Sequence, residues 1–245
     1  MNSPSTPDGP GSVSGAPNLP DGFTGTFASR YIDTGDLRQH VVTGGQGPPL
    51  LLVHGWPQTW YAWRLVMPAL ARDFTIVAPD QRGCGLSGKP QDGYDTGTLA
   101  GDLAALMDAL GHRRFAVVGH DTDAYYKISR AFTDGQPSGG LTRDHILDNI
   151  TTYWLTGTGA SAARSYWEHG RAQAPAAGQA PPPVKLPVGF TVFPGESFRA
   201  PRSWVELGYP TLGYFHEVGR GGHFAAWEEP ELFATEIRAA FRSLR

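Results

Sequence analysis

The sequence predicts an α/β fold built on a mostly parallel, doubly wound sheet. Three short apolar runs, at 50–53, 74–79 and 115–118, have the composition of strands that are covered on both faces. Segments in which apolar residues recur at helical spacing separate these runs. Such alternation over residues 50–121 is typical of a parallel sheet whose functional groups lie at the carboxyl ends of its strands.

The composition excludes several classes of function. The chain has 245 residues, of which 40% are hydrophobic and 18% charged, so it can bury the core of one sizeable domain or two small ones. A net charge of -3 without a long basic run gives no reason to expect nucleic acid or an anionic membrane surface as a partner. No apolar run could span a bilayer, no signal peptide is recognisable, and the single Cys84 cannot form an internal disulfide. We therefore expect a cytoplasmic protein.

The first part of the chain is expected to hold a tail and a hairpin. Residues 1–22 are rich in Ser, Pro, Gly and Asp, and we expect them to form a disordered tail. Residues 27–32 and 37–43 are β-rich runs on either side of the sequence Asp-Thr-Gly-Asp at 33–36. This pattern predicts a β-hairpin.

Helical spacing identifies the segments between the parallel strands. The first such segment presents Trp60, Trp63, Met67 and Leu70, which we assign to the core. The second presents Leu99, Leu103, Leu106 and Leu110, with Gly111 where a helix would end.

The second half of the chain has weaker patterns. We expect a helix at 122–132 and two helices within 141–169 that are broken around 156–159. A linker rich in Ala and Pro follows at 171–183. Strands are expected at 184–193 and 212–218, and a closing helix is marked by Phe233, Ile237, Phe241 and Leu244.

The apolar run at 115–118 leads into Gly119-His120-Asp121, the pattern of a nucleophile elbow. The residue presented at the top of the sheet is Asp121. A carboxylate at that position indicates attack on an alkyl carbon, which forms an alkyl-enzyme ester that water then cleaves. The same residues also fit an ordinary helix N-cap, because aspartate is a favoured capping residue.

Two later residues supply the groups that such a nucleophile needs. Glu196 comes just after the strand expected at 184–193, and His223 lies in a glycine-rich loop after the strand expected at 212–218. Asp121, Glu196 and His223 occur in the chain order nucleophile, acid, base. The alternatives are a solvated loop carboxylate for Glu196 and a histidine bonded to backbone for His223.

Taken together, these motifs resemble an epoxide hydrolase of the α/β-hydrolase superfamily. The sequence His-Gly-Trp-Pro at 54–57 is similar to the oxyanion-hole turn of that family, and 80–87 is similar to its Asp-x-Arg-Gly-x-Gly-x-Ser loop. Residues 119–121 match its aspartate elbow, and 193–196 and 220–230 resemble closing segments of the microsomal branch. The similarity covers most of residues 27–245.

The resemblance implies roles for further residues. Glu196 and His223 are the family's acid and base, and Tyr166 matches a cap tyrosine that polarises the epoxide oxygen, although it could equally be a helix residue packed on the core. Backbone N–H groups of Trp56 and Thr122 would form the oxyanion hole. The implied partners are a small apolar epoxide and water, with no cofactor and no metal. Nothing in the sequence indicates an oligomeric state.

The resemblance also divides the chain into domains. Residues 23–122 and 184–245 form the α/β-hydrolase core, and 123–183 form a shortened helical cap with its linker. Only about 75 residues separate Asp121 from Glu196, and they contain no strand that we can identify, whereas the family has one there. We therefore expect a reduced cap, the loss of one central strand, and an internal join near residues 120–122.

Other details depart from the family pattern. The family's second ring-opening tyrosine has no counterpart, and Asp123 stands where a small residue is expected. Two other functions stay open. A haloalkane or haloacid dehalogenase has the same nucleophile but often carries Trp or Arg where Thr122 stands. A hydrolase-like remnant or ligand-binding module would lack catalysis.

Overall fold

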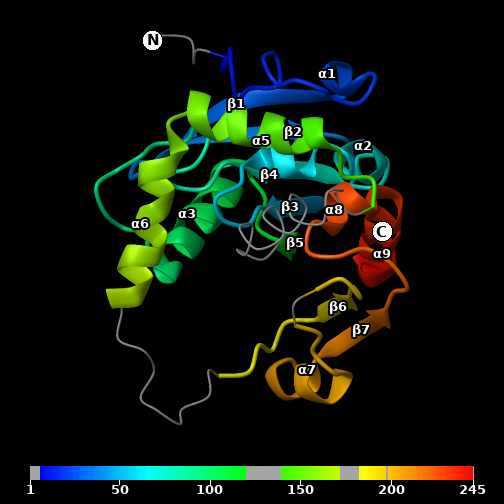
Figure 1. Cartoon of the computed structure of the whole chain (residues 1–245). Helices are drawn as coiled ribbons and strands as arrows, with labels where there is room; N and C mark the ends of the chain where they lie inside the picture. Colours follow the sequence, from blue (N-terminus) through cyan, green and yellow to red (C-terminus); the bar gives the residue numbers. More distant parts are fainter. Residues whose placement is uncertain (1–5, 120–138, 172–181, 197, 245) are drawn as a thin grey trace.

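The computed structural model describes residues 6–119, 139–171, 182–196 and 198–244. Its main sheet has five strands in the order β1-β2-β4-β3-β5 (Figure 1). The strands, in that order, are Phe27–Asp33, Arg38–Gly44, Thr75–Pro79, Pro49–Val53 and Ala116–Gly119. β3 is parallel to both of its neighbours, β4 and β5, so the predicted parallel sheet is confirmed over these strands.

The predicted hairpin forms the antiparallel edge of this sheet. β1 and β2 pair along their whole length, and Asp33 lies opposite Arg38. Gly35 adopts a φ of 91° in the connecting turn, a conformation that glycine reaches without strain. β2 then pairs antiparallel with β4, which joins the hairpin to the parallel strands.

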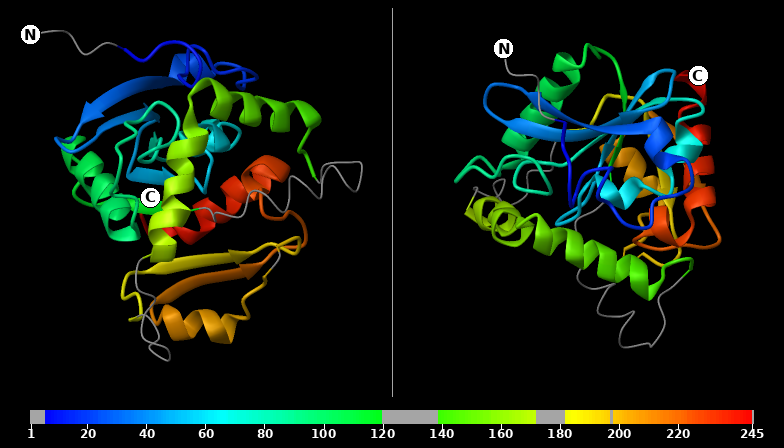
Figure 2. Two further views of the ribbon diagram at one scale, coloured as in Figure 1. Left: turned by 60° about the vertical axis from the view of Figure 1, so that its left-hand side comes forward. Right: turned by 90° about the horizontal axis from the view of Figure 1, so that it is seen from above.

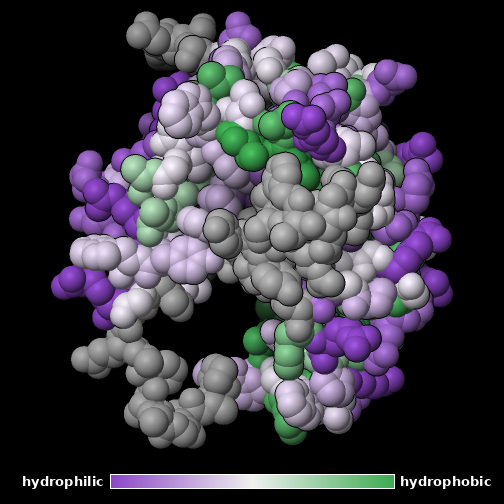
Figure 3. Space-filling view, viewed as in Figure 1, coloured by the Kyte–Doolittle hydropathy of each residue, from purple (hydrophilic) through white to green (hydrophobic). Residues whose placement is uncertain are grey.

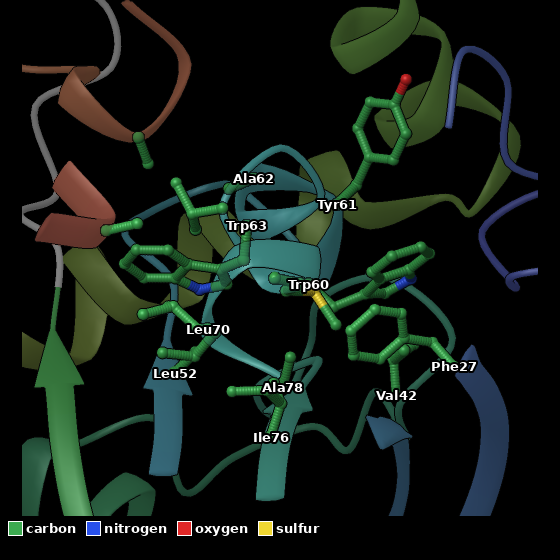
Figure 4. Packing of buried hydrophobic residues seen from close by; sticks show 14 of the residues in the cluster. Phe27, Val42, Leu52, Trp60, Tyr61, Ala62, Trp63, Leu70, Ile76 and Ala78 are labelled. Carbon is green, nitrogen blue, oxygen red and sulfur yellow. The ribbon is translucent and has the colours of Figure 1, made fainter. Parts of the chain in front are cut away.

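The apolar strands are buried because both faces of the sheet are covered. Leu50, Leu51 and Leu52 of β3 are all buried. Leu50 and Leu52 belong to a large cluster with Trp60 and its neighbours, as Figure 4 shows for Leu52. Leu51 faces the opposite side, where it packs with side chains of α3 (Thr96–Ala109). This alternation explains why the run is apolar throughout.

The segment after β3 fills the core as predicted but is not one helix. Trp60, Trp63, Met67 and Leu70 are all buried. The structure divides them between a 3-10 helix, η1 (Trp60–Trp63), and a short helix, α2 (Met67–Leu70). Pro68 stands in the first turn of α2, where its missing N–H is tolerated, so a new helix begins there.

The N-terminal segment differs from the disordered tail expected for residues 1–22. Val13 and Ser12 are buried, and a short helix, α1 (Phe23–Thr26), leads into β1. The backbone N–H of Val13 donates to Ser29 Oγ at 2.9 Å, and the indole of Trp60 donates to the carbonyl oxygen of Gly11 at 2.7 Å. Buried polar groups of the core thus hold residues 11–13, an interaction that the composition of the segment does not reveal. Residues 1–5 lie outside the described part.

The second half contains most of the expected elements. α5 (Arg143–Leu155) and α6 (Thr158–Arg171) are the two predicted helices, and α9 (Pro230–Ala240) and η2 (Arg242–Leu244) follow the short α8 (Ala225–Glu228). The helix expected at 122–132 lies outside the described residues, as does most of the predicted linker. A seven-residue helix, α7 (Arg202–Gly208), was not predicted.

The last two strands form a second sheet. β6 (Val188–Val192) and β7 (Leu212–Glu217) confirm the two predicted strands, and they pair with each other in parallel. β6 begins directly after Pro187, which cannot donate to a ladder. This two-stranded sheet lies beside α9 in Figure 2, and within the described ranges it does not pair with β5. The predicted loss of one central strand stays a prediction. None of the described helices is both long and apolar enough to cross a bilayer.

Candidate active site

Two of the predicted catalytic residues are bonded to each other. His223 Nδ1 lies 2.9 Å from Glu196 Oε1. His223 follows β7 and Glu196 follows β6, so each side chain comes from beyond the carboxyl end of one of two paired parallel strands. The imidazole is almost completely buried, and the carboxylate is partly exposed. This pair is what a base and its orienting acid require.

Backbone contacts between the two loops hold this pair in place. Gly195 and Gly222 form an isolated parallel bridge, and the N–H of Gly195 donates to the carbonyl oxygen of Gly221 at 2.9 Å. A Cβ atom on Gly195 would lie 2.9 Å from that same oxygen, so a side chain there would push the loops apart. Gly195 and Gly222 therefore permit the close approach that brings Glu196 to His223.

The histidine ring is also fixed by an aromatic neighbour. The rings of His223 and Phe224 meet edge to face, with centroids 5.2 Å apart. The backbone N–H of Phe224 donates to Glu228 Oε1 at 3.1 Å, which anchors the loop on α8. The orientation of the imidazole thus depends on packing as well as on Glu196.

A cavity of about 680 Å³ connects this pair with the end of β5. Glu196 and His223 line it, and so does Gly119, the last residue of β5. Asp121 and Thr122 follow Gly119 in the sequence, but both lie outside the described residues. Their predicted roles as nucleophile and oxyanion donor therefore remain predictions.

The loop at 80–87 is organised around one buried carboxylate. Asp80 Oδ2 lies 2.8 Å from His40 Nδ1 and accepts from the N–H of Leu86, while Oδ1 accepts from the N–H of Trp60. Burial alone would raise the pKa of Asp80, but His40 and these hydrogen bonds outweigh it and lower the pKa. Gly85 has a φ of 51°, and a Cβ there would lie 2.0 Å from the carboxylate. Asp80 is therefore structural.

His54 supports the turn that precedes this loop. Its Nε2 accepts from the backbone N–H of Gln81 at 3.0 Å, and its Nδ1 lies 2.9 Å from the carbonyl oxygen of Gly55. Burial lowers the pKa of His54, which favours the neutral ring that both contacts need. His54 thus ties the end of β3 to the end of β4.

The structure places Trp56 and Tyr166 against each other. The indole N–H of Trp56 donates to the carbonyl oxygen of Ala162 in α6 at 2.7 Å. The Tyr166 ring meets the Trp56 ring edge to face, with centroids 4.6 Å apart. The Tyr166 side chain is 51% exposed and is not among the described residues that line the cavity of His223. Its predicted contact with an epoxide oxygen is untested by this arrangement.

Sequence reasoning missed part of the cavity wall. Trp204 and Val205 of α7 line it, together with Phe198 in the preceding loop. Pro201 directly before α7 was the one available signal, since proline favours a helix start. Within the described ranges, no group of three or more His, Cys, Asp or Glu side chains could hold a metal ion.

A second polar cluster on the wall was also missed. The buried carboxylate of Glu236 on α9 accepts from Tyr214 Oη at 2.8 Å and from Thr191 Oγ1 at 3.2 Å, and it lies 3.0 Å from His216 Nδ1. These residues join α9 to β6 and β7. Their separation along the chain gives no pattern that reveals the contact.

Comparison with known proteins agrees with this architecture. A family model for the alpha/beta hydrolase fold matches residues 48–122. A protein of Stigmatella aurantiaca (strain DW4/3-1), provisionally named an epoxide hydrolase, is 31% identical over 290 aligned positions that cover 80% of this chain and 65% of the relative. A fluoroacetate dehalogenase of Burkholderia sp. is 37% identical over 156 positions, which cover 61% of this chain and half of that protein. The chain therefore spans about half to two thirds of these relatives.

A solved structure extends the similarity to three dimensions. The structure of the epoxide hydrolase CorEH without ligand superposes with a TM-score of 0.74 at 25% identity, over 89% of this chain and 100% of that one. The sheet order, the bonded Glu196–His223 pair and these comparisons point the same way. The chain has the α/β-hydrolase fold, and its sequence is similar to those of epoxide hydrolases.

Proposed function

We propose that this protein opens epoxides to vicinal diols through an alkyl ester on Asp121. The observation that carries the proposal is the hydrogen-bonded pair of Glu196 and His223, which lines the same cavity as the end of β5. The next residues along the chain after β5 include Asp121. The elbow sequence therefore supplies a nucleophile to a site that already holds a base and its partner.

In the first step, a carboxylate oxygen of Asp121 attacks an epoxide carbon. A C–O bond to the enzyme forms, the C–O bond of the three-membered ring breaks, and the ring oxygen takes a proton as it becomes a hydroxyl group. Tyr166 is the proposed hydrogen-bond donor to that oxygen, which requires α6 to present its phenol to the substrate.

In the second step, His223 removes a proton from a water molecule, which attacks the ester carbonyl carbon. Glu196 holds the ring in place and stabilises the imidazolium that forms. Backbone N–H groups of Trp56 and Thr122 are the proposed donors to the oxyanion, a contribution of about 3 kcal/mol per donor in hydrolases. The ester C–O bond then breaks, and the departing alkoxide takes the proton held by His223, which releases the diol. The Asp121 carboxylic acid loses its proton to solvent, which balances the proton taken up by the ring oxygen in the first step and restores the carboxylate.

A dehalogenase is the second candidate, because the Burkholderia relative is named as one. Both reactions begin with carboxylate attack on carbon, so the difference lies in what stabilises the leaving group. The sequence carries Thr122 where dehalogenases often have a halide-binding Trp or Arg. This residue favours the epoxide reaction.

A direct assay separates these readings. Purified protein is incubated with styrene oxide and 1,2-epoxyhexane, with fluoroacetate and 1-chlorobutane in parallel, and diol and halide are quantified. Diol formation that is lost in folded His223→Gln supports the proposal. Halide release without diol would establish the dehalogenase, and neither product from folded protein would favour a binding module or a remnant.

A further inference from the structure

The side chain of Trp56 joins the turn after β3 to helix α6. Its indole N–H donates to the carbonyl oxygen of Ala162 at 2.7 Å, although the two residues are 106 positions apart in the chain. Its ring meets the ring of Tyr166 edge to face, with an angle of 86° between the ring planes. A side chain of the proposed oxyanion turn thus contacts the residue that we propose as the donor to the epoxide oxygen.

Both contacts fall on one turn of α6. Ala162 and Tyr166 are four residues apart, so their side chains lie on the same face of the helix. In an α-helix the carbonyl oxygen of Ala162 is also the acceptor for the backbone N–H of Tyr166, and its second lone pair is available to the indole. Trp56 therefore holds the backbone turn from which Tyr166 projects, and it holds the phenol ring itself.

Other contacts fasten α6 on either side of this turn. At the start of the helix, Thr158 Oγ1 accepts from the backbone N–H of Gly85 at 2.9 Å. Near its end, Glu168 Oε2 accepts from the backbone N–H of Tyr94 at 2.6 Å. These bonds hold the two ends of the helix on the loop between β4 and α3, and the Trp56 contacts hold the turn between them.

The position of Tyr166 depends on such contacts because its side chain is half-exposed. Ala162, one turn earlier, is fully buried. α6 lies on the surface of the molecule in the view shared by Figure 1 and Figure 3, so the outer side of the helix meets solvent. A donor to a transition state must be placed closely, since a displacement of about 1 Å costs about 100-fold in rate. The contacts on the inner side of Tyr166 therefore determine whether its phenol is placed closely enough.

We propose that the side chain of Trp56 is a positioning group for Tyr166 in the ring-opening step. This inference rests on the proposed function, because it needs Tyr166 to act in the first chemical step. Trp56 then has two separate tasks. Its backbone N–H serves the second step, and its indole serves the first step through Tyr166. Substitution of the side chain keeps the backbone N–H, and ring opening precedes the oxyanion, so the rate of ring opening reports the indole.

Ring opening is measured in the His223→Gln background, where the ester is expected to accumulate. Mass spectrometry of the intact protein follows ester formation with styrene oxide over time. Trp56→Phe keeps an aromatic ring beside Tyr166 but loses the indole donor, and Trp56→Ala loses both contacts. Trp167→Phe is the matched control, because Trp167 lies on the same helix and its ring faces the guanidinium of Arg171 at 4.7 Å.

We expect ester formation to slow by about fivefold in Trp56→Phe and by about 100-fold in Trp56→Ala, since the first variant loses one hydrogen bond and the second lets Tyr166 shift. Trp167→Phe should react at the rate of the background protein. Circular dichroism and thermal unfolding establish that each variant is folded. If Trp56→Ala does not fold, Trp56→Phe carries the test.

A double-mutant cycle with Tyr166→Phe separates positioning from a merely structural role. Once the phenol hydroxyl is absent, Trp56 has no donor to place. Trp56→Phe and Trp56→Ala should then slow ester formation much less than they do when Tyr166 is present. Losses that add in full would show that Trp56 acts independently of Tyr166.

The outcomes also distinguish this inference from the proposed function. If folded His223→Gln forms no ester, the proposed function fails and the inference fails with it. If the ester forms at the same rate with and without the Trp56 side chain, or if the losses are additive, only the positioning role is overturned.

Discussion

His223 and Glu196 are separated by 27 residues, yet Nδ1 of the imidazole lies 2.9 Å from Oε1 of the carboxylate. An ionised carboxylate only accepts hydrogen bonds, so Nδ1 carries the hydrogen and Nε2 is the basic nitrogen of the neutral ring. The parallel pairing of β6 with β7 and the bridge between Gly195 and Gly222 bring the two loops together. The second step of the proposed reaction depends on this arrangement.

Replacement of Glu196 by glutamine should lower kcat for epoxide hydrolysis by about 100-fold or more, because the amide neither fixes the tautomer nor stabilises the imidazolium. Steady-state kinetics with styrene oxide measures the effect. Glu206→Gln is the matched control, since Glu206 pairs with Arg202 on the surface of α7. Equal rates for Glu196→Gln and wild type would remove Glu196 from the mechanism.

Arg82 and Asp102 form a bidentate ion pair that ties the loop after β4 to α3, with N–O distances of 2.7 and 2.8 Å. Both side chains are almost fully buried. Asp102→Ala should lower the free energy of unfolding by about 3–5 kcal/mol, because a buried guanidinium loses its partner. Urea denaturation measures the loss, and Glu206→Ala on the exposed pair should cost about 1 kcal/mol or less. Similar losses for the two variants would contradict this account.

Ser29 Oγ accepts from the N–H of Val13 and lies 2.9 Å from His40 Nε2. Ser29→Ala should destabilise the protein by about 1–3 kcal/mol, because buried polar groups lose their partner. It should also speed proteolysis of the N-terminal segment. Subtilisin, which cleaves after many residue types, measures this effect, whereas trypsin has no cleavage site before Arg30. The exposed Ser203→Ala in α7 serves as control. An N-terminal segment cleaved equally fast in both variants would show that Ser29 does not hold it.

The buried His54 predicts a pH dependence of stability. Burial lowers its pKa in the folded protein below the ordinary value of 6.5, so the unfolded chain binds the additional proton first as the pH falls. The contribution of His54 is therefore fully present above pH 6.5 and decreases as the pH falls below that value toward the lowered pKa.

Urea unfolding of wild type and His54→Gln across this range tests the prediction. The variant should be less stable near neutral pH, because it loses the fitted contacts with Gln81 and Gly55, and its stability should fall less steeply with acid. Parallel curves for the two proteins would show that His54 does not cause the dependence.

Much of the core could be predicted because its signals are local. Leu50, Leu51 and Leu52 form an apolar run that is typical of a doubly covered strand, and Leu106 marks the helix that covers one face. The pairing of Glu196 with His223 was also accessible, because both follow predicted strands in the order of the superfamily.

The remainder depends on contacts between distant segments. Val13 lies in a Ser- and Gly-rich stretch, and only the core partner Ser29 reveals that it is buried. Trp204 lines the cavity beside Glu196 and His223 from α7, a helix of seven residues that is too short to show a repeating apolar pattern. Tyr166 was predicted from family similarity, and its contact with Trp56 depends on how α6 packs.

The central claim is that Asp121 forms an ester with the substrate and that His223 directs water to it. The most direct test is mass spectrometry of wild type and folded His223→Gln after brief mixing with styrene oxide, followed by peptide mapping. We predict that the peptide containing Asp121 gains the mass of one epoxide in the variant, and that this adduct does not accumulate in wild type. An unmodified Asp121 peptide in folded variant, or an adduct on another residue, would contradict the mechanism.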